Sequence, residues 1–174
     1  DSENNRDTRL FLECINEAFS DLGEKIYKER KEYLEKILPF ADSIYSGLAS
    51  GKEEINFSYI KKGDASDVLS FEEILKRHEN ADIASKMTLT GPHRDDIEIN
   101  INGVPARNFG SQGQKRSAAI ALKLAEAEVM KEFTDEEPLI LLDDVMSELD
   151  SSRQDYILNH IKDKQVFITC CDPS

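Results

Sequence analysis

The first forty residues repeat their apolar positions at the spacing of an α-helix. Gly23 separates the repeat into two stripes, and Pro39 follows the second one. The stripes comprise Leu10, Phe11, Cys14, Ile15, Ala18, Phe19 and Leu22, and then Ile26, Tyr27, Arg30, Tyr33, Leu34, Ile37 and Leu38. Because glycine breaks such a pattern and proline ends or kinks a helix, we expect two amphipathic helices joined at Gly23. The pattern predicts a helical hairpin whose apolar faces serve core packing.

Beyond residue 54 the apolar positions change to the period of a β-strand. Apolar and polar residues alternate over 55–59 and again over 96–101. The dipeptide Asn102-Gly103 is a strong signal for a two-residue hairpin turn. We therefore expect an antiparallel return strand that begins at Val104.

Two further helices are predicted from the residues that precede them. Ser70 and Glu73 have the spacing of a capping box, which predicts a short helix. Residues 110–114 form a small, hydrogen-bonding loop, and the Ala- and Leu-rich segment 115–130 has high helix propensity. The N–H groups of this loop and the helix N-terminus are suited to bind an anion. Taken alone, however, such a loop is more often a simple helix cap.

The last third of the chain predicts a strand, a helix and a second strand. Residues 139–142 are all apolar, which suits a strand buried on both faces in a parallel sheet. A helix from about Ser152 and a strand over 165–169 complete a parallel crossover unit. Asp143 and Asp144 follow the first strand at its carboxyl end, where open α/β sheets place their ligands.

The adjacent carboxylates of Asp143 and Asp144 are candidates for metal chemistry. One can coordinate Mg²⁺ while the other orients or deprotonates a water. The alternative is a solvated strand end with a helix-capping aspartate. Combined with the loop at 111–114, the pair favours nucleotide chemistry. The nearest approach to a P-loop, at 47–53, lacks one residue between its glycines and has Glu53 where Ser or Thr should bind Mg²⁺. We interpret it as a coincidence.

The charge balance argues against a chain that coats nucleic acid over its whole surface. Lys and Arg total 22 against 35 Asp and Glu, giving a net charge of -13, whereas phosphate binding depends on dense cationic neutralisation. A local basic patch remains compatible with this balance. Lys115, Arg116 and Lys123 are candidates for such a stripe, and a solvated helix face is the alternative.

Length and cysteine usage predict a protein of the reducing cytosol with one core. The chain has 174 residues, of which 39% are hydrophobic, and no apolar run approaches the ~20 residues that span a bilayer. The polar start cannot be a secretory signal. Cys14, Cys170 and Cys171 are odd in number and two are adjacent, which does not fit a disulfide framework.

Three segments in combination resemble the RecF family of SMC-like DNA-repair ATPases. They are LTGPHRDD at 89–96, FGSQGQKRSAAIALKLAE at 109–126 and LLDDVMSELD at 141–150. The helical segment GEKIYKERKEYLEKIL at 23–38 fits as well. RecF proteins are longer and carry a P-loop near their N-terminus, so the resemblance implies a fragment that corresponds to their C-terminal portion.

The resemblance implies an α/β fold: an incomplete ABC-ATPase head, with a P-loop NTPase-like sheet and flanking helices, plus a helical-hairpin arm. The arm (lobe II) would cover residues 1–50, and 51–174 would form the C-terminal part of the head. SQGQ at 111–114 resembles the signature loop of ABC-type ATPases. LILLDD at 139–144 resembles their Walker B strand, and SELD at 147–150 resembles their D-loop.

The resemblance also implies which residues bind ATP. In a dimer, the signature loop of one subunit would meet the ATP held by the P-loop of the other. Ser111, Gly113 and Gln114 would contact its γ-phosphate, with Gln112 in the same binding loop. Asp150 would belong to the nucleotide interface and would communicate, with Ser147, across the dimer.

The catalytic roles implied by the resemblance fall on the two aspartates. Asp143 would hold Mg²⁺, and Asp144 would position the hydrolytic water. Asp144 replaces a glutamate common in transporters of the superfamily, which favours slow, switch-like hydrolysis. Many ABC ATPases carry a switch histidine after the last strand, where this chain has Thr169 and cysteines. His93 is open to a sensor or a structural role, and Arg94 to an anion contact or to salt bridges with Asp95 and Asp96.

The implied function is that of an ATP-controlled DNA clamp in replication, recombination, repair and the SOS response. It would dimerise on ATP, bind gapped duplex or single-strand/double-strand junctions, and help load recombinase with mediators such as RecR. The complete protein would be a slow ATPase, and the isolated chain would be inactive without a P-loop. The alternatives are an SMC or Rad50-like head, a transporter ATPase, or a non-catalytic interaction domain.

Overall fold

The computed structural model describes residues 2–64, 67–147 and 149–170, with only the backbone for 2–8. Their contacts divide the chain into two compact units. Unit 1 comprises 1–33 and 58–98, and unit 2 comprises 34–57 and 99–174. The division predicted from the sequence, an arm over 1–50 and a head portion over 51–174, stays a prediction. Within the described segments, no helix is long and apolar enough to cross a membrane.

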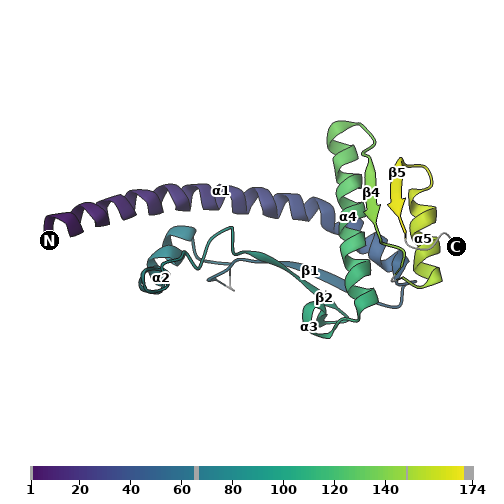
Figure 1. Ribbon diagram of the computed structural model, residues 1–174, viewed down its shortest axis with the longest axis horizontal. Helices are drawn as coiled ribbons and strands as arrows, with labels where there is room; N and C mark the ends of the chain where they lie inside the picture. Colours follow the sequence, from purple (N-terminus) through teal and green to yellow (C-terminus); the bar gives the residue numbers. More distant parts are fainter. Residues whose placement is uncertain (1, 65–66, 148, 171–174) are drawn as a thin grey trace. The chain divides into compact units, whose positions relative to one another are not determined.

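Helix α1 (Ser2–Leu48) is one continuous helix, so the predicted hairpin broken at Gly23 is wrong (Figure 1). A single glycine in a helix interior costs only about 1 kcal/mol. Gly23 is also buried, and an added Cβ would lie 3.2 Å from the Phe71 ring, so its small size allows close packing. Pro39 lies inside the same helix on an exposed position. Packing therefore outweighs both local breaking signals, through Gly23 itself at Phe71 and through the buried Ile37 and Ala41 on either side of Pro39.

In unit 1, helix α2 (Phe71–Ser85) packs through Phe71 and Ile74, both fully buried. The predicted capping box is confirmed. The Ser70 hydroxyl accepts a hydrogen bond from the Glu73 N–H at 3.2 Å, and the Glu73 carboxylate accepts one from the Ser70 N–H at 2.8 Å. The Phe71 N–H, which has no partner within the helix, donates to Glu24 of α1 at 2.6 Å.

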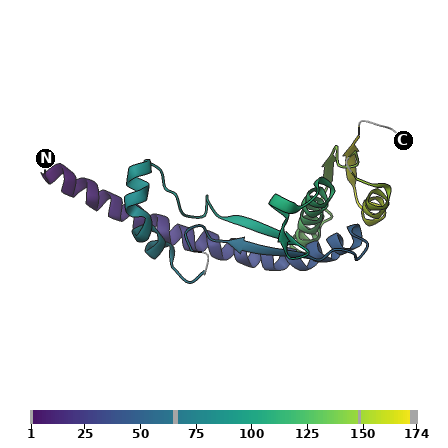
Figure 2. The ribbon, with the colours of Figure 1, turned by 90° about the horizontal axis from the view of Figure 1, so that it is seen from below.

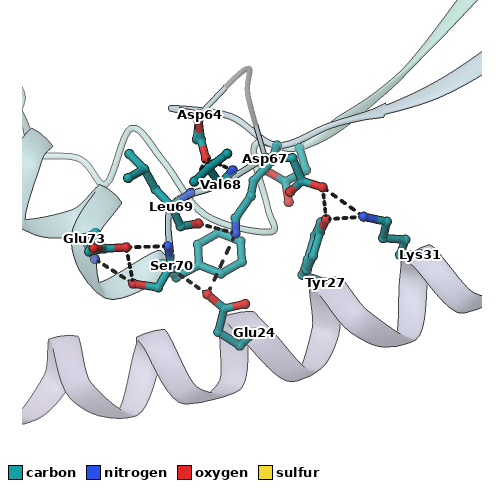
Figure 3. A network of polar contacts seen from close by, with 12 residues as sticks. Glu24, Tyr27, Lys31, Asp64, Asp67, Val68, Leu69, Ser70 and Glu73 are labelled. Atoms are coloured by element: carbon teal, nitrogen blue, oxygen red, sulfur yellow. Dashed lines mark hydrogen bonds and ion pairs between the residues drawn. The ribbon is translucent and has the colours of Figure 1, made fainter.

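A polar network fastens the loop before α2 to α1 in the same unit (Figure 3). Asp67 accepts hydrogen bonds from Tyr27 and from Lys31, the latter at 2.9 Å. The side chain of Lys61 is almost fully buried and donates to the Leu69 carbonyl at 2.8 Å. Its ammonium also lies 3.8 Å from Glu24. The buried cation is thereby compensated by a carboxylate and a carbonyl oxygen.

Strands β1 (Ile55–Ile60), β2 (Asp96–Ile101) and β3 (Val104–Pro105) form a sheet in that order. The predicted hairpin is confirmed: β2 and β3 are antiparallel, and Ile101 pairs with Val104. Asn102 and Gly103 have positive φ angles of 50° and 77°, as a two-residue hairpin turn requires.

In unit 2, a short helix α3 (Ala106–Phe109) leads to α4 (Gln112–Thr134). Strand β4 (Ile140–Asp143), helix α5 (Ser151–Ile161) and strand β5 (Val166–Thr169) then follow. Strands β4 and β5 are parallel and lie side by side, which confirms the predicted crossover unit (Figure 2). Their carboxyl ends coincide at the pair Asp143 and Thr169.

Burial of β4 on both faces is wrong for the described chain. Ile140 and Leu142 join the core, but Leu141 is 70% exposed and Phe167 of β5 is 60% exposed. The reason is that α4 and α5 supply apolar partners such as Leu124 and Ile157 to one face only. Only every second residue of the apolar run is therefore buried by the described part of the chain.

Candidate functional site

The predicted signature loop is the N-terminus of α4. Ser111 is the N-cap, and its hydroxyl accepts a hydrogen bond from the Gln114 N–H at 3.2 Å. The Gln114 side-chain oxygen accepts one in return from the Ser111 N–H at 2.8 Å. Ser111 and Gln112 are exposed, whereas Gly113 and Gln114 are half-buried. The loop thus presents Ser111 and Gln112 at the open end of a long helix, where an anion is favoured.

Both polar atoms of the Gln114 side-chain amide have a hydrogen-bond partner within the chain. Its oxygen belongs to the capping box with Ser111, and its nitrogen donates to Glu53 at 3.1 Å. The Glu53 carboxylate also accepts a hydrogen bond from Tyr45 at 2.6 Å. Burial and the neighbouring Glu53 carboxylate raise the pKa of Tyr45, so its hydroxyl remains a neutral donor.

Arg153 of α5 completes a cluster with Tyr45, Glu53, Gln114 and Asp150, which we call the Glu53 cluster. Its guanidinium lies 3.7 Å from Glu53 and 3.7 Å from Asp150. Asp150 is the N-cap of α5 and accepts the Arg153 N–H at 3.0 Å. The cluster therefore joins the predicted signature loop to the predicted D-loop.

Gly113 permits the close approach of α5 to the signature loop. A Cβ at this position would lie 2.8 Å from the Arg153 guanidinium, well inside van der Waals contact. The glycine of the motif thus has a packing reason in this chain in addition to its predicted role toward phosphate.

The two aspartates lie at the carboxyl end of β4, as predicted. Asp143 is exposed and accepts a hydrogen bond from the Thr169 hydroxyl of β5. The Asp144 N–H donates to the Thr169 hydroxyl at 3.0 Å and to its carbonyl at 3.2 Å. Asp144 has a positive φ of 48°, and its carbonyl accepts a hydrogen bond from Arg116 of α4. Arg116 thereby connects the first turns of α4 to the end of β4.

Asp143 fits the way proteins hold Mg²⁺. Magnesium is typically bound through one or two carboxylates, with waters and substrate phosphates completing the octahedron. Over the described ranges, no group of three or more His, Cys, Asp or Glu residues is arranged as an all-protein metal site. An exposed carboxylate at a strand end suits a nucleotide-dependent Mg²⁺ site.

The segment after Asp144 is held by short polar contacts. The Ser147 hydroxyl donates to the Asp144 carbonyl at 3.3 Å. The Gln154 side chain of α5 donates to the carbonyls of Met146 and Leu149, at 2.8 Å and 3.1 Å. Glu148 of the predicted D-loop lies outside the described residues, as does Cys171.

The contacts of His93 favour a structural role. In unit 1 its ring nitrogen lies 3.2 Å from the Thr88 carbonyl, and the ring meets Phe19 edge-on at 6.0 Å. Asp95, a predicted salt-bridge partner of Arg94, instead accepts hydrogen bonds from Tyr59 at 2.7 Å and from the backbone N–H of Lys62 at 2.8 Å. The role of Arg94 stays a prediction.

The predicted basic stripe on α4 consists of side chains with intramolecular partners. Lys115 donates to the Arg107 carbonyl at 2.9 Å, and Lys123 pairs with Glu126 at 2.7 Å. Arg116, described above, turns toward the end of β4. These contacts favour local roles over a continuous phosphate-binding surface.

Sequence reasoning missed Glu53 and Arg153. In the sequence, Glu53 stood out only as a residue that does not fit a P-loop, and Arg153 belonged to no recognised motif. The spacing of Asp150 and Arg153, three residues apart at a helix start, was a weak signal for an ion pair. No local pattern placed Glu53 beside them, because that contact joins segments about one hundred residues apart.

Comparison with known proteins gives one consistent family. No protein-family model matches the chain. The DNA replication and repair protein RecF of Clostridium kluyveri is 45% identical over 161 residues, covering 91% of this chain and 44% of the relative. RecF of Clostridium tetani is 44% identical over 161 residues, covering 89% of this chain and 44% of the relative. The chain thus spans less than half the length of these curated relatives.

Solved structures give the same result for the fold. A structure of the recombination mediator protein RecF-ATPrS in the RecFOR pathway matches with a TM-score of 0.76 and 36% identity, covering 94% of this chain and 46% of that one. A RecF-ATP structure matches with a TM-score of 0.76 and 34% identity over the same shares. The α/β fold is accordingly that of part of the RecF ATPase. In both sequence and fold, the chain is a counterpart of the C-terminal portion of RecF proteins.

Proposed function

We propose that this chain provides the signature, Walker B and D-loop side of a RecF-like ATPase head in DNA replication and repair. ATP would close a homodimer on DNA, and hydrolysis would release it. The observation that carries the proposal is the direct connection of the α4 N-terminus to the carboxyl end of β4 through Arg116 and Asp144. Relatives named for DNA replication and repair, and neighbours solved with ATP or ATPrS, support it.

In this proposal the partner subunit's ATP meets Ser111 and Gln112. The Ser111 hydroxyl oxygen already accepts a hydrogen bond from the Gln114 N–H. Its hydrogen can rotate about the C–O bond, so the hydroxyl can also donate to a phosphate oxygen. Both polar atoms of the Gln114 amide are engaged inside the chain. Gln114 therefore shapes the loop, and direct contact with a γ-phosphate while the cap stays closed would use the second N–H of its side-chain nitrogen.

The aspartates have separate roles in the proposal. Asp143 would hold Mg²⁺, which neutralises phosphate charge when it is bound. Asp144 would orient the hydrolytic water, with its backbone fixed by Thr169 and Arg116. Because its side chain is one methylene shorter than glutamate, we expect slow hydrolysis, and the hydrolysis rate would set how long the dimer stays closed.

The partners follow from the family. We propose binding to gapped duplex or to junctions of single- and double-stranded DNA, and cooperation with mediators such as RecR in loading recombinase. The net charge of -13 indicates that this chain contributes local contacts to DNA, because extensive phosphate binding needs many cations. A non-catalytic interaction domain is the alternative that the experiment must separate. An SMC or Rad50-like head, the other alternative, would also dimerise on ATP, and it is disfavoured by the relatives, which are named RecF.

Sedimentation of the chain in its full natural sequence tests the proposal, with and without Mg-ATP. Ser111→Arg would place a bulky cation where the partner's ATP is expected. Ser70→Arg is the matched control, because Ser70 caps α2 through an equivalent capping box. We expect ATP to convert monomer to dimer in the wild type and in Ser70→Arg, and to leave Ser111→Arg monomeric. If ATP changes the mass of none of the three proteins, the proposal of an ATP-dependent dimer is wrong, and the non-catalytic interaction domain is favoured.

A further inference from the structure

We propose that Glu53 and Arg153 form a coupling pair that makes the signature loop and the D-loop move as one unit. The inference rests on the proposed function, because it concerns how nucleotide contact at Ser111 and Gln112 reaches Asp150. Neither Glu53 nor Arg153 is placed in contact with nucleotide. Both are positioning residues that act through Gln114 and Asp150.

Glu53 is the centre of the arrangement because both of its carboxylate oxygens are used. One accepts from Tyr45, whose side chain is fully buried in α1, and this bond fixes the carboxylate to the core. The other oxygen accepts from Gln114 and lies near Arg153. Glu53 is thus anchored to the core and contacts both α4 and α5.

Burial makes the pair sensitive to the loss of either partner. The side chains of Glu53 and Arg153 are only 19% and 16% exposed. A charge held in such a site is poorly solvated, so removing its partner leaves an uncompensated group. Arg153 is further confined by Gly113 on one side and by Asp150 on the other.

The chain of contacts gives a physical route between two functional segments. A ligand that draws Ser111 outward strains the capping box, whose Gln114 amide is shared with Glu53. Movement of Glu53 or Gly113 displaces the Arg153 guanidinium, and Arg153 belongs to the first turn of α5 that Asp150 caps. The contacts of the Glu53 cluster would then have a different free energy when α4 is in its ligand-bound position and when it is not. This difference couples the signature loop to the D-loop, as allostery requires.

The test uses the full natural sequence with Glu53→Gln, Arg153→Gln and the double variant. Each single change removes one charge at nearly constant volume. Glu128→Gln is the matched control, because Glu128 pairs with Lys164 at 2.9 Å with comparable burial and lies farther along α4. The readouts are the ATP-dependent dimer dissociation constant, ATP binding by the monomer, and hydrogen exchange of the Arg153 amide.

We expect each single variant to weaken ATP-dependent dimerisation by about five-fold or more, with monomer ATP binding unchanged. The double variant should be no weaker than the worse single variant, and exchange at Arg153 should accelerate in Glu53→Gln. Glu128→Gln should match the wild type in dimerisation. A merely structural role would instead lower thermal stability in all the variants without separating Glu53→Gln from its control.

Failure of this inference is distinguishable from failure of the proposed function. If Ser111→Arg abolishes the ATP-dependent dimer while Glu53→Gln and Arg153→Gln dimerise normally, the coupling pair is refuted and the proposed function stands. Additive losses in the double variant also refute the pair. If the wild type ignores ATP, the proposed function fails, and this inference fails with it.

Discussion

The packing of α1 against α5 gives the sharpest structural prediction. Gly47, in the last turn of α1, faces the ring of Tyr156. A Cβ at Gly47 would lie 2.1, 2.2 and 2.4 Å from the Cε2, Cζ and hydroxyl atoms of that ring. The ring cannot yield freely, because it packs against the hydrophobic core and stacks on His160 at a centroid distance of 5.9 Å. Gly47→Ala should therefore push α5 away from α1.

The expected magnitude combines two opposing effects. Carbon contacts are optimal near about 3.5–4.0 Å, so the added methyl group intrudes by more than about 1 Å. Overpacking of this kind costs about 1–3 kcal/mol, whereas replacing glycine by alanine within a helix gains about 1 kcal/mol. Because three ring atoms would lie within 2.4 Å of the new Cβ, we expect the overpacking cost to fall in the upper part of its range, at about 2–3 kcal/mol. The net loss is then about 1–2 kcal/mol, which lowers the melting temperature by about 2–8 °C in a chain of this size.

Urea unfolding of a double-variant cycle tests this reasoning. Tyr156→Ala deletes the ring, so adding Gly47→Ala on that background should be neutral or stabilising. Gly23→Ala is the control in the same helix, because its Cβ would lie at 3.2 Å from the nearest atom of Phe71 and should cost less. Equal losses from Gly47→Ala with and without the Tyr156 ring would refute the steric explanation.

Two further predictions concern unit 1. Lys61→Met should destabilise the protein by about 2 kcal/mol in urea unfolding, because it leaves Glu24 and a loop carbonyl without their cation; the exposed Lys62→Met should have little effect, and equal effects would contradict the role of burial. Burial, and then the Asp95 carboxylate, raise the pKa of Tyr59 to about 12. Because the folded state holds this proton more tightly, the stability it contributes is complete below about pH 10 and is lost as the pH rises toward about 12. Tyr59→Phe should flatten that part of a stability profile, and an unchanged slope would contradict the assignment.

Local signals in the sequence predicted the elements that local chemistry determines. The predicted capping box at Ser70 forms because serine and a residue three positions later satisfy N–H groups that a helix start leaves open. Ser111, where only a helix cap was expected, forms a second capping box for the same reason. The turn at Asn102 and Gly103 forms because these residues tolerate positive φ. The crossover unit of β4, α5 and β5 also needed only the order of its elements.

The errors came where packing overrides a local preference. Gly23 and Pro39 are unfavourable in a helix taken alone, but Gly23 itself packs against Phe71, and the turns around Pro39 are held in the core by Ile37 and Ala41. Leu141 belongs to a run typical of a strand with two covered faces, yet the described chain covers one. In both cases the residue's neighbours in space decide the outcome, and the pattern along the chain does not contain them.

The candidate site shows the same division more sharply. The described motif residues lie at or next to the predicted places, a helix N-terminus and a strand end, since anion and metal chemistry select residue types at such places. The predicted loop is shorter than expected, because residues 112–114 already form the first turn of α4. What turns these places into a site is the set of contacts between them, made by Arg116 and by the Glu53 cluster. Glu53 is in no motif, and its meaning depends on Gln114 and Arg153, which are distant in sequence. A motif can therefore predict where chemistry is placed, whereas the coupling between such places is determined by residues that only the fold brings together.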